Sequence, residues 1–268
     1  MNQDLNQLLE WAKTFAHDAG AIMREYYALA DKSIEIKQDK SPVTIADKKI
    51  NQLLIDRVQA EFPEHGVLGE EDSLHPERQQ LWVCDPIDGT AGFILGVPTA
   101  MLSLAYVVDG QTRVAVLYEP LLDKLFTASL GSGAFLNGEP IRVSHTTTLE
   151  GASIGLTASV KQMFIREKFC KALLDDGVFL NTVPGNVFKA SLVAQGRMDG
   201  FIFPGRSAHD IAGEKLIIEE AGGKVTSLDG KEQRYDGPIR GAVVSNGHIH
   251  DALVAHITDF GVEDYLGF

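Results

Sequence analysis

The stretch LWVCDPIDGT, Leu81 to Thr90, places two carboxylates three residues apart at the end of an apolar run. The run that ends at Cys84 has the composition of a buried strand, and Pro86 and Gly89 are residues that favour turns. Two interpretations of the aspartates are open. They can be turn residues that bond nearby backbone amides, or they can share a cation, because like charges held close together need a positive partner.

The composition is that of an ordinary globular protein. The chain has 268 residues, of which 44% are hydrophobic, enough for one large domain or two packed subdomains. Its net charge is −13 and no basic stripe is visible, which argues against a nucleic-acid polymer or an anionic membrane surface as the partner. A small anionic substrate is not excluded, because a bound divalent cation reverses the local field.

Targeting and redox signals are weak. The two cysteines, Cys84 and Cys170, are too few for a disulfide framework. The N-terminal segment lacks the continuous apolar core of a signal peptide, and no run approaches the ~18 apolar residues of a membrane span. We therefore expect a cytoplasmic protein. His248 and His250 lie near the end of the chain and are expected at the surface.

The spacing of apolar residues indicates a mixed α/β chain. Helical spacing from Leu5 to Tyr26 and from Ile50 to Phe62 predicts two amphipathic helices. The segment 102–128 alternates like antiparallel strands, with tight turns at 109–110 and 137–138. Further strands are predicted at 33–37, 66–72, 81–85 and 199–203, and further helices at 161–174, 187–196 and 209–223.

The composition changes around Thr146 to Gly151, which marks a boundary between two halves. The interpretation is an N-terminal α+β half, residues 1–147, and a C-terminal α/β half, residues 148–268, that share one interface.

Three further acids each have a plain local explanation. Glu70 can belong to a solvated acidic loop, and Asp47 and Asp210 can cap helices. Taken together with Asp85 and Asp88, however, they place carboxylates at several strand and loop ends, where open α/β folds bind ligands. Oxygen-rich sites of this kind suit magnesium.

The residues around the second aspartate extend this hypothesis. The Ile87 carbonyl lies between Asp85 and Asp88 and offers one more oxygen ligand. Gly89 and Thr90 follow, and their backbone amides suit a phosphate group. Metal ions next to an anion site indicate phosphoryl transfer to water.

Four motifs in order resemble the inositol monophosphatase superfamily of magnesium-dependent, lithium-sensitive phosphatases. WVCDPIDGT is similar to its metal-binding signature, and GEED is similar to its Gly-Glu-Glu motif. HDIAGEKLIIEEAGG resembles its C-terminal Trp-Asp-x-Ala-Ala-Gly motif, with His209 in place of tryptophan, and KSPVTIADKKI resembles its lysine-to-aspartate segment. The matches run from about Lys37 to Gly223. The resemblance implies a layered α-β-α-β-α sandwich of the inositol monophosphatase and fructose bisphosphatase type.

The resemblance also implies a site that binds two or three magnesium ions. The first would be held by Glu70, Asp85 and the Ile87 carbonyl, the second by Asp85, Asp88 and Asp210, and a third, weaker ion by Glu70 and water. Thr90 and Asp47 resemble the family pair that orients and deprotonates the attacking water, so the implied catalytic residues are Thr90, Asp47 and Glu70.

The substrate is less defined than the metal site. The implied substrate contacts are Gly89, Thr90, Lys37, Lys189 and Arg206. Lys189 matches the lysine of bacterial phosphoadenosine-phosphate phosphatases, although a solvated helix lysine is the simpler interpretation.

Three functions stay open at this point. The first is hydrolysis of an inositol, polyol or sugar phosphate by direct attack of water, and the second is a 3′(2′),5′-bisphosphate nucleotidase. The third is a non-catalytic phosphate-binding protein. The resemblance also suggests a homodimer.

Overall fold

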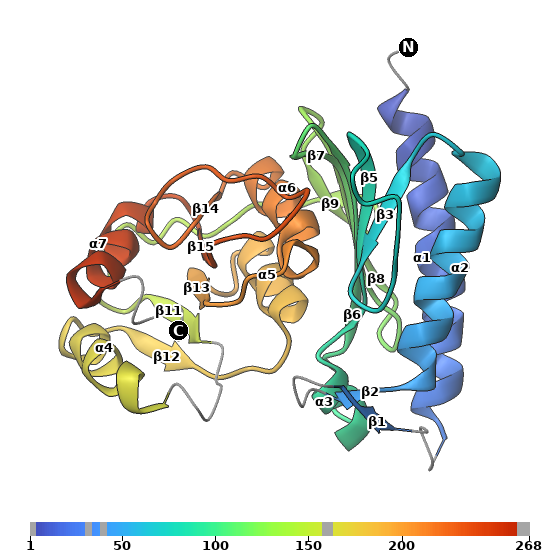
Figure 1. Ribbon diagram of the computed structural model, residues 1–268. Coiled ribbons are helices and arrows are strands. Elements are labelled where there is room, and N and C mark those ends of the chain that lie inside the picture. Colours follow the sequence, from blue (N-terminus) through green and yellow to red (C-terminus); the bar gives the residue numbers. More distant parts are fainter. Residues whose placement is uncertain (1–3, 30–33, 38–41, 157–162, 262–268) are drawn as a thin grey trace.

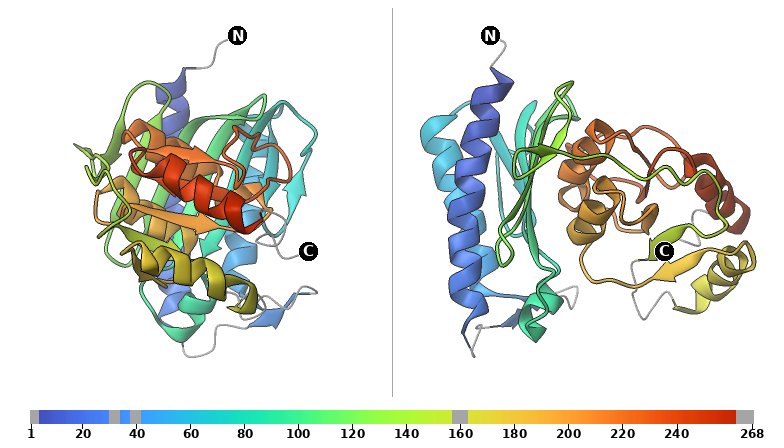
Figure 2. Two further views of the ribbon diagram at one scale, coloured as in Figure 1. Left: turned by 90° about the vertical axis from the view of Figure 1, so that its left-hand side faces the viewer. Right: turned by 180° about the vertical axis from the view of Figure 1, so that it is seen from behind.

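Helices and sheets alternate in five layers in the computed structural model, which describes residues 4–29, 34–37, 42–156 and 163–261 (Figure 1). The helices of this part are α1 (Leu5–Tyr27), α2 (Ile45–Glu61), α3 (Thr90–Leu95), α4 (Met163–Asp175), α5 (Asn186–Ala194), α6 (Ala212–Glu220) and α7 (His250–Phe260). From α1 and α2 the layers continue through a larger sheet, α5 with α6, a smaller sheet, and α4 with α7 (Figure 2). The predicted α-β-α-β-α sandwich is confirmed.

The larger sheet has eight strands in the order β10-β9-β8-β7-β6-β5-β3-β4, and β3 and β5 are its parallel pair. Its strands are β3 (Gly66–Gly69), β4 (Ser73–Leu74), β5 (Gln80–Asp88), β6 (Met101–Val108), β7 (Gln111–Glu119), β8 (Lys124–Ser129), β9 (Ala134–Leu136) and β10 (Glu139–Pro140). A separate two-stranded sheet, β1 (Glu35–Ile36) with β2 (Pro42–Val43), lies beside α3.

The smaller sheet has five strands in the order β12-β11-β13-β15-β14. They are β11 (Ser153–Leu156), β12 (Phe179–Asn181), β13 (Gly200–Phe203), β14 (Lys224–Thr226) and β15 (Ala242–Ser245). The predicted strands and helices are present wherever they fall within the described residues; part of the segment 33–37 and the start of the helix at 161–174 lie outside them. Elements that the sequence did not predict include β2, β11, β12, β14, β15 and α7.

The apolar side chains form three clusters that fill the spaces between the layers. One lies between α1, α2 and the larger sheet, the second surrounds α5 and α6 between the two sheets, and the third lies beneath α4 and α7. Strand β5 contributes to two of them because successive side chains of a strand point to opposite faces. Trp82 and Cys84 face the first cluster, and Leu81 and Val83 face the second.

The stretch around Pro86 is not the turn that its composition suggests. Strand β5 continues to Asp88, and Asp85 pairs with Ser103 whereas Asp88 pairs with Met101. Two residues of β5 therefore lie opposite one residue of β6, which is a β-bulge. A bulge accommodates a proline because the missing N–H is not needed for the ladder. The turn comes at Gly89, whose φ is 81°, and α3 begins at the next residue.

The hairpin turns follow their sequence signals. Asp109 and Gly110 both have positive φ, and so do Asn137 and Gly138. This conformation matches the twist of the two flanking strands and suits asparagine, aspartate and glycine. Both predicted turns are confirmed.

The connection between the two sheets, from Pro140 to Ser153, is held by a polar network. The Asp199 carboxylate accepts hydrogen bonds from the Ser144 hydroxyl at 2.5 Å and from the Ser153 N–H at 2.7 Å. The Asn246 amide donates to the Ser144 hydroxyl as well. The division of the chain at 147/148 into two halves stays a prediction. No helix of the described ranges is both long and apolar enough to cross a membrane.

The expected surface position is right for His248 and wrong for His250. His250 is 1% exposed, and its two ring nitrogens lie 2.9 Å from the hydroxyls of Thr226 and Ser245. These hydroxyls come from β14 and β15, so α7 packs onto the smaller sheet through this ring. Burial lowers the pKa of His250 to about 4.

Acidification should therefore weaken the fold through His250. Its folded pKa lies below the unfolded value of about 6.5, so its stabilising effect is complete above pH 6.5 and is lost as pH falls towards 4. Between pH 7.5 and 5.0 the wild type should lose about 2 kcal/mol more unfolding free energy than His250→Gln. Urea unfolding at both pH values measures this difference. The exposed His248→Gln is the matched control, and an equal pH dependence of wild type and His250→Gln would contradict the assignment.

Candidate active site

Three aspartates from two distant segments meet in one cluster. Asp85 and Asp88 come from the bulged end of β5, and Asp210 comes from the 3₁₀ turn Ala208–Asp210 that precedes α6. One carboxylate oxygen of each lies within 4.8 Å of the others. Asp210 was predicted at a helix start, but it does not cap α6, whose first residue is Ala212 and whose N-cap is Ile211.

The cluster is electrostatically unfavourable as it stands. Burial raises the pKa of Asp85 and of Asp210 well above the usual range, and repulsion from neighbouring carboxylates adds to this effect. Burial also raises the pKa of Asp88, but Lys189 and two backbone amides oppose the shift. Carboxylates crowded in this way become stable as anions when they share a cation.

Asp88 joins the two sheets through α5. Its carboxylate oxygens accept hydrogen bonds from the Asn186 N–H at 3.1 Å and from the Val187 N–H at 2.9 Å, so it binds the positive end of the helix dipole. The approach requires glycine at position 185, where φ is 83° and an added Cβ would lie 2.8 Å from Asp88 Oδ2. The side chain of Asn186 also forms a hydrogen bond with Asp210.

Glu70 lies at the edge of the cluster, directly after β3. Its carboxylate is close enough to Asp85 for a hydrogen bond, and its charge also acts on Asp210. The Lys37 ammonium binds Glu70 at 2.8 Å and Glu71 at 2.6 Å. Desolvation lowers the pKa of Lys37, but its contacts with Glu70 and Glu71 outweigh this and raise the pKa overall. Lys37 therefore stays a cation beside the cluster.

Thr90 and Asp47 form the predicted pair. The Thr90 hydroxyl lies 3.0 Å from the Ile87 carbonyl and 3.4 Å from Asp47 Oδ1. Asp47 is fully buried in the first turn of α2, and its other oxygen accepts hydrogen bonds from the Thr44 N–H and hydroxyl. The capping interpretation of Asp47 is thus correct, and the same side chain also reaches the site. Burial raises the pKa of Asp47 to about 6.

A cleft of about 550 Å³ opens beside these groups. Its lining includes Glu70 and Asp88 from the acidic side, Gly89 and Thr90 at the start of α3, and Lys189 of α5. The remaining lining residues are Pro42, Ala91, Leu156, Thr182, Val183, Pro184, Gly185 and Asn186.

Lys189 is not the solvated lysine that its helix position suggests. It is 2% exposed, its ammonium donates to the Val183 carbonyl at 3.2 Å, and it lies over the ring of Phe201. Burial lowers its pKa to about 8, although the nearby Asp88 opposes the shift. It therefore remains largely protonated at neutral pH. Arg206, in contrast, is exposed and lines a separate hollow.

A family model described as the inositol monophosphatase family matches residues 4–261. The chain belongs to this family. A fructose-1,6-bisphosphatase/inositol-1-monophosphatase from Thermotoga maritima is 31% identical over 251 residues, which cover 94% of this chain and 96% of that protein. A histidinol-phosphatase from Chlorobaculum parvum is 32% identical over 262 residues, which cover 96% and 97%. The solved structure of an IMPase from Thermotoga maritima has a TM-score of 0.86 at 30% identity and covers 96% of this chain and 99% of that one.

Membership of the inositol monophosphatase family makes the chain a phosphoric monoester hydrolase of a metal-dependent group. The names of its relatives refer to inositol phosphate, fructose bisphosphate and histidinol phosphate. The family therefore establishes the class of reaction and leaves the substrate open.

The sequence did not predict a role for two residues near the aspartate cluster, Asn186 and Glu214. Asn186 gave no signal beyond its place in a Pro-Gly-Asn segment ahead of a helix. Glu214 did carry one, because it stands where the family motif has its final glycine. Glu214 is fully buried in α6, and neither of its carboxylate oxygens has a well-formed hydrogen bond among the described residues. Burial raises its pKa well above the usual range, and the charges of Asp88 and Asp210 act in the same direction.

Replacing Glu214 should therefore stabilise the metal-free protein. Because its folded pKa exceeds the unfolded one, ionisation of Glu214 costs stability as pH rises above about 4.5. Glu214→Gln should raise the unfolding free energy in chelator by about 1–3 kcal/mol at pH 8 and by less at pH 5. Thermal or denaturant unfolding at the two pH values measures the gain. Glu61→Gln, at the exposed end of α2, is the control; a Glu214→Gln protein no more stable than the wild type would contradict the prediction.

Proposed function

We propose that this family member is a magnesium-dependent phosphomonoesterase that hydrolyses a small phosphate ester by direct attack of water on phosphorus. The substrate is an inositol monophosphate or another polyol or sugar phosphate. The observation that carries the proposal is the buried cluster of Asp85, Asp88 and Asp210 next to the Thr90–Asp47 pair, at the edge of one cleft.

The donor atoms of the site fit magnesium. They are carboxylate and carbonyl oxygens, which a hard divalent cation prefers. Glu70, Asp85 and the Ile87 carbonyl would hold one ion, and Asp85, Asp88 and Asp210 a second, with Glu70 also available to a third. When bound, the ions supply charge stabilisation at the phosphoryl oxygens and lower the pKa of the attacking water.

The Thr90–Asp47 pair would accept the proton of the attacking water. The Thr90 hydroxyl can donate to Asp47 or Ile87, which leaves its lone pairs for a proton from water. With a pKa of about 6, Asp47 is a stronger base than an exposed aspartate and still largely ionised at neutral pH. The water oxygen then bonds to phosphorus, the bond from phosphorus to the alcohol oxygen breaks, and the alcohol takes a proton from solvent.

The cleft offers backbone amides and lysine side chains that can bind the phosphate ester. Gly89 precedes α3 and Thr90 is its first residue, and backbone amides at this place suit a phosphate oxygen. Lys37 adds positive charge beside Glu70, and Lys189 adds it beside Asp88. Release of inorganic phosphate from inositol 1-phosphate, glycerol 2-phosphate and fructose 1,6-bisphosphate, with magnesium and with excess chelator, tests the function. Undiminished release in chelator would refute the metal requirement.

Asp85→Asn should lower kcat by at least ~100-fold at saturating magnesium. Asparagine keeps the shape of the side chain but replaces one anionic ligand oxygen with an amide group. The fold should be kept or stabilised in chelator, since one of the crowded charges is gone. Steady-state kinetics and thermal unfolding on the same preparations check both effects, and near-normal turnover would remove Asp85 from the ligand set.

Thr90→Val should separate proton transfer from metal binding. Valine has the same shape but no hydroxyl, so kcat should fall by about 100-fold or more. Magnesium should still raise the melting temperature of Thr90→Val. The magnesium concentration that gives half of this rise should stay within about twofold of the wild-type value, whereas in Asp85→Asn it should not. Unchanged turnover would exclude Thr90 from the proton path.

The burial of Lys189 favours a second candidate function, a 3′(2′),5′-bisphosphate nucleotidase. A largely protonated lysine inside the cleft can bind a second phosphate group, which a bare polyol does not need. The ratio of kcat/KM for adenosine 3′,5′-bisphosphate to that for inositol 1-phosphate distinguishes the two functions. Lithium inhibition, a cytoplasmic location and a homodimer stay predictions from the family resemblance.

A further inference from the structure

A hollow of about 220 Å³ borders the carboxylate cluster on the side of β3 and the 3₁₀ turn. Two of its lining residues, Gly69 and His209, directly precede Glu70 and Asp210 in the chain. His209 Nε2 lies 3.8 Å from Asp210 Oδ2. The charges of Glu70 and Lys37 both act on His209. The hollow therefore adjoins the groups proposed to bind metal and phosphate.

The lining of this hollow differs from that of the main cleft. Its walls are the apolar side chains of Leu68, Ala208 and Pro238, and polar atoms come from Arg206, Ser207 and His209. None of the described residues that line it is acidic, whereas the main cleft contains Glu70 and Asp88. A polyol placed here would lose hydrogen bonds between its hydroxyls and water, and the apolar walls offer none in return. An aromatic ring loses no such hydrogen bonds and gains from the burial of its apolar surface.

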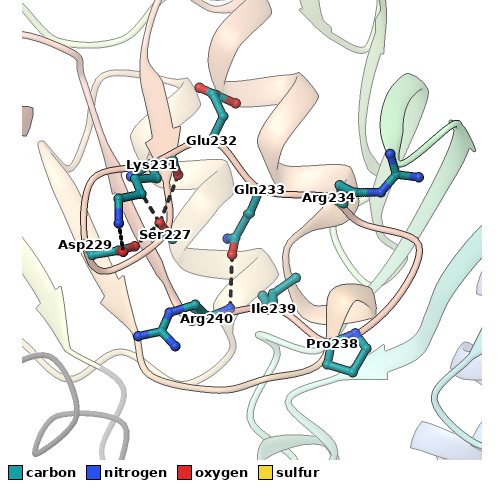
Figure 3. A pocket seen from close by; sticks show the side chains of 9 residues that line it. All are labelled: Ser227, Asp229, Lys231, Glu232, Gln233, Arg234, Pro238, Ile239 and Arg240. Carbon is teal, nitrogen blue, oxygen red and sulfur yellow. Dashed lines mark hydrogen bonds and ion pairs between the residues drawn. The ribbon is translucent and has the colours of Figure 1, made fainter.

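The wall formed by Pro238 is held in place by backbone contacts. The Ile239 N–H donates to the Arg206 carbonyl at 2.9 Å, and the Gly241 N–H donates to the Gly205 carbonyl at 3.0 Å. The side chain of Gln233 stabilises the same loop, because its amide oxygen accepts a hydrogen bond from the Arg240 N–H at 3.0 Å (Figure 3). The hollow is thus formed before a ligand arrives, which reduces the ordering cost of binding.

The neighbouring hollow in Figure 3, of about 520 Å³, does not share these properties. Its charged groups are largely satisfied within the loop, since Lys231 pairs with Asp229 at 2.8 Å and Arg234 pairs with Asp236. Pro238 lines both hollows, but His209 does not line this one. Its residues therefore serve as controls.

From this placement we propose that the hollow beside His209 is a leaving-group subsite for a planar aromatic ring. The inference rests on the proposed phosphatase function and changes its preferred substrate from a bare polyol or sugar phosphate to an ester whose alcohol carries such a ring. With phosphate at Gly89 and Thr90, the alcohol would extend past Asp210 so that its ring contacts Leu68 and Pro238. The Arg206 guanidinium can stack on the ring or bind a second anionic group on it.

His209 is the feature of this chain that favours a ring. Its imidazole lines the hollow together with Ala208 and Leu68, so a flat ring of the ligand can pack against it.

The test compares two esters of primary alcohols, 2-phenylethyl phosphate and 2-hydroxyethyl phosphate, with magnesium present. Both leave as aliphatic alkoxides, so the ring is the main difference. We expect kcat/KM to be at least about tenfold higher for the phenylethyl ester, chiefly through a lower KM, because the ring buries apolar surface. Equal values for the two esters would overturn the inference while leaving the proposed function intact.

A variant that fills the hollow makes the test specific. Gly237 has an ordinary φ, and an added Cβ would meet no atom within 4 Å, so Gly237→Leu introduces bulk without backbone strain. It should reduce the preference for the phenylethyl ester by at least about fivefold. Lys231→Leu, on the same loop but in the other hollow, should leave the preference unchanged. A preference that survives in Gly237→Leu would place the ring elsewhere and overturn the assignment.

A binding measurement separates this inference from the proposed function. Calorimetric titration of both esters in the presence of calcium measures ring affinity without turnover. If magnesium supports no phosphate release from these esters or from the three substrates named above, but the phenylethyl ester binds more tightly and Gly237→Leu removes the difference, the proposed function fails and the subsite stands. If the esters bind equally, the subsite is refuted.

Discussion

Repulsion among buried carboxylates is the constraint on which the rest of this structure depends. Asp85, Asp88 and Asp210 meet within 4.8 Å, and Glu70 is close enough to Asp85 for a hydrogen bond. Removing even one unpaired carboxylate from water costs several kcal/mol, so a fold selected for stability alone would not keep four together. The five layers hold them in place through contacts elsewhere. The site therefore reflects the usual conflict between stability and activity.

The contact between Asp88 and α5 shows how the fold partly relieves this repulsion. Asp88 belongs to the larger sheet, but its carboxylate binds the N-terminal amides of a helix that packs between both sheets. The bond depends on two glycines, Gly89 and Gly185, which have positive φ and allow the backbones to approach. The bulge in β5 is equally necessary, because it sets the spacing of Asp85 and Asp88 along the strand. The interface between the layers is thus also part of the site.

The sequence predicted those features that depend on local pattern. Helical spacing located α1 and α2, the paired turn residues located the hairpins, and motif order located the acidic residues and Thr90. Features that depend on burial were missed. A lysine in a helix predicts solvent exposure, but Lys189 lies inside the cleft; His250, near the chain end, fills the interface beneath α7. Pro86 predicted a turn because composition does not reveal that β6 continues alongside as a partner strand.

The charges around the cleft also bear on how many ions the proposed mechanism needs. The carboxylates of Asp85, Asp88, Asp210 and Glu70, together with a phosphate dianion, carry six negative charges when fully ionised. Lys37 and Lys189 offset at most two of them, because both are cations at neutral pH and Lys37 also pairs with Glu71. At least four negative charges remain, which two divalent cations would offset. A single ion would leave a net negative site that repels its own anionic substrate, so the charge balance favours at least two ions whenever phosphate is bound.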